Sequence, residues 1–255
     1  MRILCTNDDG INADGLKIVE KIARTLTEDV WVVAPELDQS GVSHSLSLND
    51  PLRLRQVGPR HFAVRGTPTD CVIMGSRHVC ADKMPDAILS GVNRGRNVAE
   101  DVVYSGTIAG ALEGTILGLP SFALSQEFGI DSRHKPFWDT ALKFGPDIVQ
   151  RILKVGVPRN VVINVNFPAC APDEVRGVVV TRQGKRNQGF LRIDERRDGR
   201  NNPYFWIGFE RLAQTEPPPE GTDLAAMAAR FVSVTPLRLD RTDEEFSRAL
   251  LDVLN

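Results

Sequence analysis

Short apolar runs that end in clusters of polar residues recur along the first hundred residues of the chain. The first run, Arg2 to Thr6, stops at Asn7-Asp8-Asp9-Gly10. It is brief, contains side chains that strands accept and is closed by turn residues, so it predicts a buried strand. Two later runs have the same form: Val30–Ala34 before the polar segment Pro35–Ser45, and Pro85–Ser90 before Gly91–Asp101.

A helical pattern separates the first two predicted strands. Between Ala13 and Glu28, apolar residues recur at helical spacing. Strand, helix and strand in this order form a βαβ unit with parallel strands. The pattern then predicts a hairpin near 52–57 and 61–65, a helix starting at Thr67-Pro68, a helix over Ser105–Gly114, a strand over Pro120–Ser125, a helix over Phe137–Val155 and a strand over Asn160–Phe167. We therefore expect an α/β fold with a mainly parallel sheet.

The character of the chain changes after residue 175. Val178–Thr181 is strand-like, but Arg182–Asn202 is crowded with charges, glycine and asparagine and has too little apolar surface to fold against the core alone. Tyr204–Ile207 beyond it supplies aromatic surface. Three interpretations stay open: a surface loop, a segment disordered in a monomer, or an arm exchanged between subunits. We expect a core over 1–180 and an extension over 181–255 that carries this arm and a final helix.

Composition and charge narrow the possible partners. Charged residues make up 25% of the 255 residues, both signs are interspersed and the net charge is −2. Such a surface attracts neither nucleic-acid polymers nor anionic membranes. The four cysteines, Cys5, Cys71, Cys80 and Cys170, lack the spacing of a zinc site or a disulfide framework. The start of the chain has no basic segment followed by an apolar one, and no apolar run could cross a bilayer. We expect a soluble, cytoplasmic protein with a small substrate.

The polar segments after the three strands suggest a metal site. In a doubly wound parallel sheet, ligands bind beyond the carboxyl ends of the strands, so these segments would open at one edge. Two carboxylates, a hydroxyl and an amide, from Asp8, Asp9, Ser40 and Asn93, would form an oxygen-only shell that suits Mg²⁺ or Mn²⁺. Taken alone, Asn7–Gly10 is more typical of a solvated turn than of a metal site. The convergence of the three segments favours the metal site.

Ser105-Gly106-Thr107 suggests a phosphate site at the start of the predicted helix. Free backbone N–H groups and two hydroxyls at the positive end of a helix dipole suit a phosphate, although Ser105 alone is also an ordinary N-cap. The residues therefore indicate metal-assisted hydrolysis of a small phosphate ester, in which one aspartate takes the proton of the attacking water. Arg94 and Arg96 are candidates to stabilise the developing charge, and His44 is a candidate leaving-group acid.

An ordered set of motifs resembles the SurE family, the survival-protein 5′/3′-nucleotidases. The motifs are Asn7–Gly10, Ser40–Leu46, Gly66–Asp70, Ser90–Asn97, Asp101–Thr107, Asn164–Pro168, Thr181–Gly184 and Gly221–Asp223. The resemblance runs nearly end to end. It implies a Rossmann-like three-layer core, a C-terminal extension exchanged between subunits and a divalent-metal-dependent phosphatase of nucleoside monophosphates. It also implies homodimers that often pair into tetramers.

The same resemblance assigns roles to individual residues. By position, the metal ligands are Asp8, Asp9, Ser40 and Asn93. Asn97 and the turn Ser105-Gly106-Thr107 lie around the bound phosphate. Ala99 stands where many members carry glycine, and Ser47 stands where threonine is usual. Neither departure affects the predicted metal site.

Two other functions are alternatives to a metal-dependent nucleotidase. In haloacid-dehalogenase-like phosphatases an aspartate after the first strand becomes phosphorylated, but the two carboxylates are then separated by one residue, whereas Asp8 and Asp9 are adjacent. A non-catalytic nucleotide-binding module is the second alternative. The first turn lacks the G-x-G-x-x-G pattern of a dinucleotide site.

Overall fold

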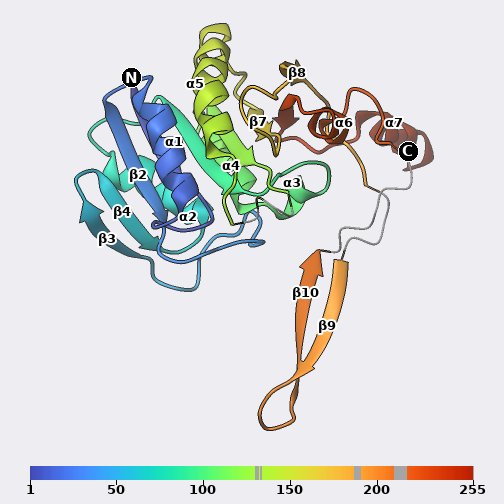
Figure 1. Cartoon of the computed structure of the whole chain (residues 1–255), viewed down its shortest axis with the longest axis horizontal. Helices are drawn as coiled ribbons and strands as arrows, with labels where there is room; N and C mark the ends of the chain where they lie inside the picture. Colours follow the sequence, from blue (N-terminus) through green and yellow to red (C-terminus); the bar gives the residue numbers. More distant parts are fainter. Residues whose placement is uncertain (130–131, 133, 187–190, 210–216, 255) are drawn as a thin grey trace.

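The computed structural model describes residues 1–129, 132, 134–186, 191–209 and 217–254. Within these residues, a central sheet has nine strands in the order β3-β4-β2-β1-β5-β6-β7-β11-β8 (Figure 1). The strands are β1 (Arg2–Thr6), β2 (Asp29–Pro35), β3 (Arg53–Gly58), β4 (His61–Arg65), β5 (Ala87–Arg94), β6 (Ser121–Gln126), β7 (Val161–Phe167), β8 (Val178–Val180) and β11 (Val232–Arg238).

The sheet is mainly parallel, as the sequence predicts. β4, β2, β1, β5, β6 and β7 pair in parallel, while β3 is antiparallel to β4 and β11 is antiparallel to β7. The chain order runs from β1 outward to β2 on one side and to β5 on the other, so a switch in strand order lies at β1. The loops after β1, β2 and β5 open at one edge of the sheet, where such folds bind ligands.

Helices cover both faces of the sheet. α1 (Asp14–Arg24) and α5 (Trp138–Val155) share a core with one face through Val19, Ile22 and Val149. α2 (Pro68–Met74), which continues as the π-helical turn η1 (Gly75–Val79), and α4 (Gly106–Ile116) pack on the other face. The remaining helices are α3 (Asp101–Tyr104), α6 (Asp223–Ala228) and α7 (Glu244–Leu254). No helix among the described residues is long and apolar enough to cross a membrane.

Among the element boundaries, two differ from the predictions by four residues. The helix predicted to reach Glu28 ends at Arg24, because the hydroxyl of Thr25 donates to the carbonyl of Ile22 at 2.7 Å and competes with the helical pattern. β5 extends to Arg94, so the segment from Gly91 to Arg94 is strand and was wrongly predicted as loop. The pairing of β5 with β6 shifts register between Ser90 and Asn93, and this irregularity hides the strand in the sequence.

The charged segment after residue 182 contains a strand that the sequence analysis missed. β9 (Leu191–Arg197) pairs antiparallel with β10 (Pro203–Phe209), and this hairpin stands off from the body of the molecule (Figure 1). Its large apolar side chains are exposed: Ile193, Tyr204, Phe205, Trp206 and Ile207. The hairpin is thus the part predicted as an exchange arm, and the exchange itself stays a prediction.

Residues beyond 180 also complete the body of the fold. β11 lies between β7 and β8 in the central sheet, and α6 packs against the loop that follows β5 through Leu224 and Met227. β11 therefore belongs to the same sheet as the predicted core, and α6 packs against it.

Candidate active site

The acidic turn after β1 places two carboxylates at the edge of the sheet. Asp8 is buried, and burial together with the charge of Asp9 raises its pKa to about 7. The Asp9 Oδ2 atom accepts the backbone N–H of Arg94 at 3.2 Å, and burial raises the pKa of this carboxyl as well. A buried and a half-buried carboxylate side by side are costly unless a cation or a proton neutralises them.

The turn itself is held by the residues on either side of the two aspartates. The Asn7 side chain is fully buried and its Nδ2 atom donates to the Gly10 carbonyl at 2.9 Å. Gly10 has a φ of +100°, which a side chain would strain. The sequence prediction of a glycine-dependent turn at this position is confirmed.

The loop after β2 contacts the acidic turn through its backbone. The Gln39 N–H donates to the Asp8 carbonyl at 2.8 Å, which brings Ser40, itself exposed, to the next position along the chain. Asp38 accepts the Ser40 N–H at 2.7 Å, and its charge raises the pKa values of both Asp8 and Asp9. This third carboxylate near the pair was missed by the sequence analysis.

The end of β5 brings Asn93 to the same edge. The Asn93 Nδ2 atom donates to the Gly95 carbonyl at 3.0 Å, so its side-chain oxygen is the atom left to bind a cation. Arg94 follows directly, and its backbone contact with Asp9 ties the β5 loop to the acidic turn. The structure thus brings together the elements that carry Asp8, Asp9 and Asn93.

The two candidate arginines lie beside the segment that follows β6. The Arg94 guanidinium lies over the Phe128 ring at 5.7 Å from its centre, and Arg96 Nη1 is 2.7 Å from Glu127 Oε1. His44, the candidate leaving-group acid, lies 3.0 Å from the Glu113 carboxylate in the second half of α4. That partner is well past the first turn of the helix, so this side chain fastens the loop to α4 in this structure.

The start of α4 contacts the buried carboxylate directly. The Thr107 hydroxyl donates to Asp8 Oδ1 at 2.6 Å, and Ser105 caps the helix by accepting the Ile108 N–H at 3.1 Å. A Cβ atom at Gly106 would lie 2.7 Å from Asp8 Cβ, so only glycine permits this approach. Ser105 is therefore an N-cap, and the helix N-terminus that it caps also touches the acidic turn.

Asn97 is fixed by buried polar side chains from two neighbouring strands. Its N–H donates to Asn166 Oδ1 at 2.7 Å, its Nδ2 donates to Ser125 Oγ at 2.9 Å, and its carbonyl accepts Asn164 Nδ2 at 2.8 Å. These partners carried no role in the sequence analysis. Two asparagines at alternate positions of an otherwise apolar strand are a signal for them, because buried amides need partners.

The side chains at this edge suit a hard divalent cation. No group of three or more His, Cys, Asp or Glu side chains that could hold a metal occurs in the described part of the chain. A cation here would depend on amide and hydroxyl oxygens besides Asp8 and Asp9, which is the chemistry of Mg²⁺ or Mn²⁺ sites. The two carboxylates and the Asn93 side-chain oxygen, which accepts no hydrogen bond within the described part of the chain, fit such an ion.

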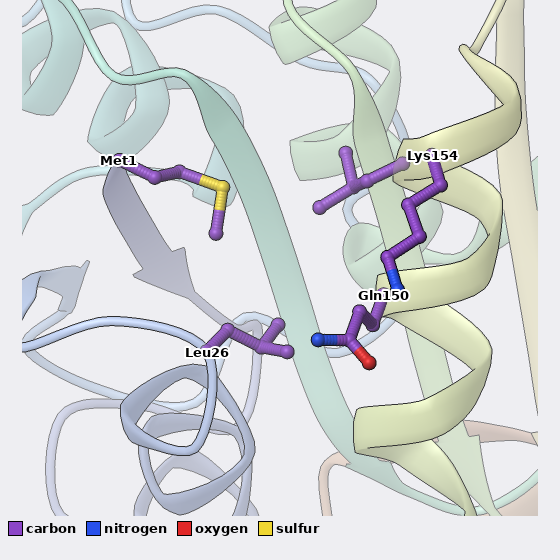
Figure 2. Close-up of a pocket in the computed structure, with 5 residues that line it drawn as sticks. Met1, Leu26, Gln150 and Lys154 are labelled. Carbon is purple, nitrogen blue, oxygen red and sulfur yellow. The ribbon is translucent and has the colours of Figure 1, made fainter.

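Of two hollows on the surface, one lies beside the candidate site and the other lies on the opposite edge of the sheet. One, of about 310 Å³, is lined by Glu36, Leu37, Gln39, Val64, Arg65 and Gly66 at the carboxyl ends of β2 and β4, beside the candidate site. The other, of about 230 Å³, lies among Met1, Leu26 and the end of α5 (Figure 2). It is at the amino end of β1, on the opposite edge of the sheet.

Comparison with known proteins identifies the family. The model of the family described as Survival protein SurE matches residues 3–189. The chain belongs to the SurE family. A SurE protein named 5′-nucleotidase SurE from Bradyrhizobium sp. (strain BTAi1) is 80% identical over 254 residues, covering 100% of both chains. The protein of the same name from Rhodopseudomonas palustris (strain BisB5) is 79% identical with the same coverage.

A solved SurE structure confirms the predicted fold class. The crystal structure of the SurE protein from Aquifex aeolicus is 38% identical, covers 100% of both chains and superposes with a TM-score of 0.85. The resemblance seen in the ordered motifs and the α/β, Rossmann-like class are both confirmed. Membership of the SurE family also favours the nucleotidase hypothesis over the aspartyl-phosphate and non-catalytic alternatives.

Proposed function

We propose that this chain is a divalent-metal-dependent 5′-nucleotidase that also accepts 3′-monophosphates. The observation that carries the proposal is the 2.6 Å hydrogen bond from Thr107 to Asp8. It joins the helix N-terminus, which suits a phosphate, to the carboxylate pair, which suits a cation. The names of the SurE relatives support the nucleotidase activity.

In this proposal different residues bind the metal ion, bind the phosphate and accept the proton of the attacking water. Asp8, Asp9, Ser40 and Asn93 would hold Mg²⁺ or Mn²⁺, and the ion supplies positive charge at the phosphoryl oxygens and acidifies bound water. Asn97, Ser105, Gly106 and Thr107 bind the phosphate through the Asn97 amide, the backbone N–H groups of Gly106 and Thr107 and the Ser105 hydroxyl, while the Thr107 hydroxyl stays bonded to Asp8. One carboxylate of the pair takes the proton of the attacking water. The products are a nucleoside and phosphate.

A substrate panel tests the activity. We expect phosphate release from AMP and GMP with Mg²⁺ or Mn²⁺, slower release from 3′-AMP and from an aryl phosphate, and loss of release in excess chelator that added metal restores. The 3′-AMP and aryl phosphate reactions separate nucleotide recognition from general phosphatase activity. Full turnover in excess chelator would contradict the metal site, and absence of release from every nucleotide would contradict the function.

We further propose that two subunits exchange the β9–β10 hairpin and that such dimers pair into tetramers. The exposed Phe205, Trp206 and Ile207 support this, because they leave large apolar side chains on both faces of a two-stranded hairpin, and such side chains are typical of subunit interfaces. Replacing residues 191–209 with a short Gly/Ser linker is expected to lower the mass seen by sedimentation velocity to that of one chain. A variant with Asp194→Ser and Arg196→Ser keeps the aromatic side chains and is expected to sediment like the wild type. An unchanged mass after the deletion would refute the exchange.

A further inference from the structure

The buried carboxylate of Asp223 joins the loop after β5 to the base of the hairpin arm. Asp223 is fully buried at the start of α6. Its Oδ2 atom accepts the N–H of Ala99 at 2.9 Å, and its Oδ1 atom accepts the N–H groups of Gly184 at 2.8 Å and Leu224 at 2.7 Å. One side chain thus fixes residues on both sides of the arm to a loop more than a hundred residues away.

The residue that Asp223 holds has an unfavourable backbone conformation. Ala99 has a φ of +53°, and this left-handed region costs a residue with a Cβ atom on the order of 1 kcal/mol. Its carbonyl accepts Gln183 Nε2 at 2.9 Å, so both backbone polar groups of Ala99 are bound by the C-terminal segment. Glycine adopts such a φ freely, so at this position alanine carries a backbone cost that glycine would not.

The next two residues of the loop are held by the same segment. The Arg186 N–H donates to the Glu100 carboxylate at 3.1 Å. The Arg186 guanidinium makes two bonds of 2.6 Å to the Asp101 carboxylate, and both side chains are largely buried. A paired guanidinium and carboxylate of this kind fixes distance and orientation together. The whole of 99–101 is therefore bound to residues 183–186 and 223.

Asn97 lies two residues before Ala99 in this loop. Strand residues Ser125, Asn164 and Asn166 hold it on one side, while Asp223 and Gln183 set the path of the chain immediately beyond it. Misplacement by one ångström at a binding group is enough to weaken catalysis severely. The loop therefore depends on the C-terminal segment for the conformation that presents Asn97.

We infer that Asp223 is a positioning residue for the phosphate end of the site, acting through Ala99 on Asn97. This rests on the proposed function. Gly184 and Asp223, on either side of the β9–β10 hairpin, thereby hold the loop 97–101 that carries Asn97. In this way the C-terminal segment contributes to substrate binding without touching the substrate.

Asp223→Asn tests the inference, because asparagine keeps the shape but loses one of the two acceptor oxygens. We expect KM for AMP to rise about tenfold, the cost of a lost bond to a charged group, with a smaller fall in kcat. Inhibition by inorganic phosphate is expected to weaken by a similar factor. Asp198→Asn is the matched control, because Asp198 accepts backbone N–H groups in the exposed turn of the hairpin and is expected to leave KM unchanged.

A double-mutant cycle separates positioning from general stability. If Asp223 acts through Asn97, adding Asp223→Asn to Asn97→Ala is expected to cause no further rise in KM. Multiplicative effects of the two changes would overturn the inference. Gln183→Ala, which removes only the bond to the Ala99 carbonyl, is expected to raise KM in the same direction by a smaller factor and serves if Asp223→Asn does not fold.

Amide hydrogen exchange provides a readout that does not require activity. In Asp223→Asn, peptides covering 97–101 are expected to exchange at least about tenfold faster than in the wild type, while those of β1 stay unchanged. If the wild-type protein hydrolyses no nucleotide, the proposed function is refuted. The hydrogen-exchange rates then decide alone whether Asp223 holds the loop 97–101. An active wild type with normal KM and normal exchange in the variant would refute the coupling alone.

Discussion

Replacing Asp8 with asparagine is expected to lower kcat on the order of 10³-fold while the protein stays folded. The change removes a charge that a divalent cation requires and a base that could accept a proton. The fold should tolerate it, because the buried Asp8 carboxylate is disfavoured in the charged form and its pKa is raised to about 7. An asparagine oxygen can still accept the Thr107 hydroxyl, which now lies 2.6 Å from Oδ1.

The same substitution is expected to change how stability depends on pH in the metal-free protein. Because the folded-state pKa of Asp8 is about 7 and lies above the unfolded value of about 3.8, the wild type keeps a proton that the unfolded chain loses. Its stability should fall as pH rises from 4 to 7, by on the order of 4 kcal/mol from this group. Asparagine cannot titrate, so the variant should show a flatter profile in chelator.

Thermal unfolding at several pH values, with and without Mn²⁺, measures this effect beside the activity assay. Asp14→Asn is the control, because Asp14 is exposed at the start of α1 and its pKa is lowered by Lys17. That variant should keep wild-type turnover. Appreciable activity in Asp8→Asn would contradict the role of this carboxylate, and an unchanged pH profile would contradict its burial as a neutral acid.

Gly106→Ala is expected to lower kcat/KM by about 10²-fold. The new Cβ atom would stand 2.7 Å from Asp8 Cβ, a distance that forces the start of α4 away from the acidic turn. The Thr107–Asp8 hydrogen bond would lengthen, and displacements of about 1 Å in a binding group cost activity of this order. Steady-state kinetics with AMP and Mn²⁺ measures the loss.

Gly110→Ala is the matched control for that change. Gly110 lies one turn further along α4, and its Cβ atom would meet the ends of the Ser90 and Thr6 side chains at 2.9 and 3.1 Å. Rotation of these small groups relieves the contact, and alanine favours the helix by up to about 1 kcal/mol. We expect kcat/KM close to the wild type. Equal losses in both variants would show that general packing of α4 decides the activity.

Much of the fold follows from the sequence because local pattern and global arrangement agree. The short apolar runs closed by polar residues became β1, β2 and β5, and their parallel pairing brings the loops that carry Asp8, Asp9 and Asn93 to one edge. The glycine-rich start of α4 was also predicted. These features depend on residues that are close together in the sequence, so the sequence alone is enough to predict them.

The contacts that the sequence did not reveal join residues far apart in the chain. Asp223 bonds to Ala99 across more than a hundred residues, and Asn164 and Asn166 bond to Asn97 across nearly seventy. Composition and periodicity do not show which polar atoms form hydrogen bonds when their residues lie far apart in the sequence. The strand in the charged arm was missed for a related reason, since β9 depends on its partner β10 and not on a buried face.

Three glycines of α4 let the helix backbone pack directly on the sheet and on the acidic turn. Gly106, Gly110 and Gly114 face Asp8, Ser90 and Ile88 without any intervening side chain. At Gly106 in particular, a side chain would push the start of α4 away from the acidic turn. The distance between the start of α4 and Asp8 is thereby set by backbone packing and not by the choice of a side chain.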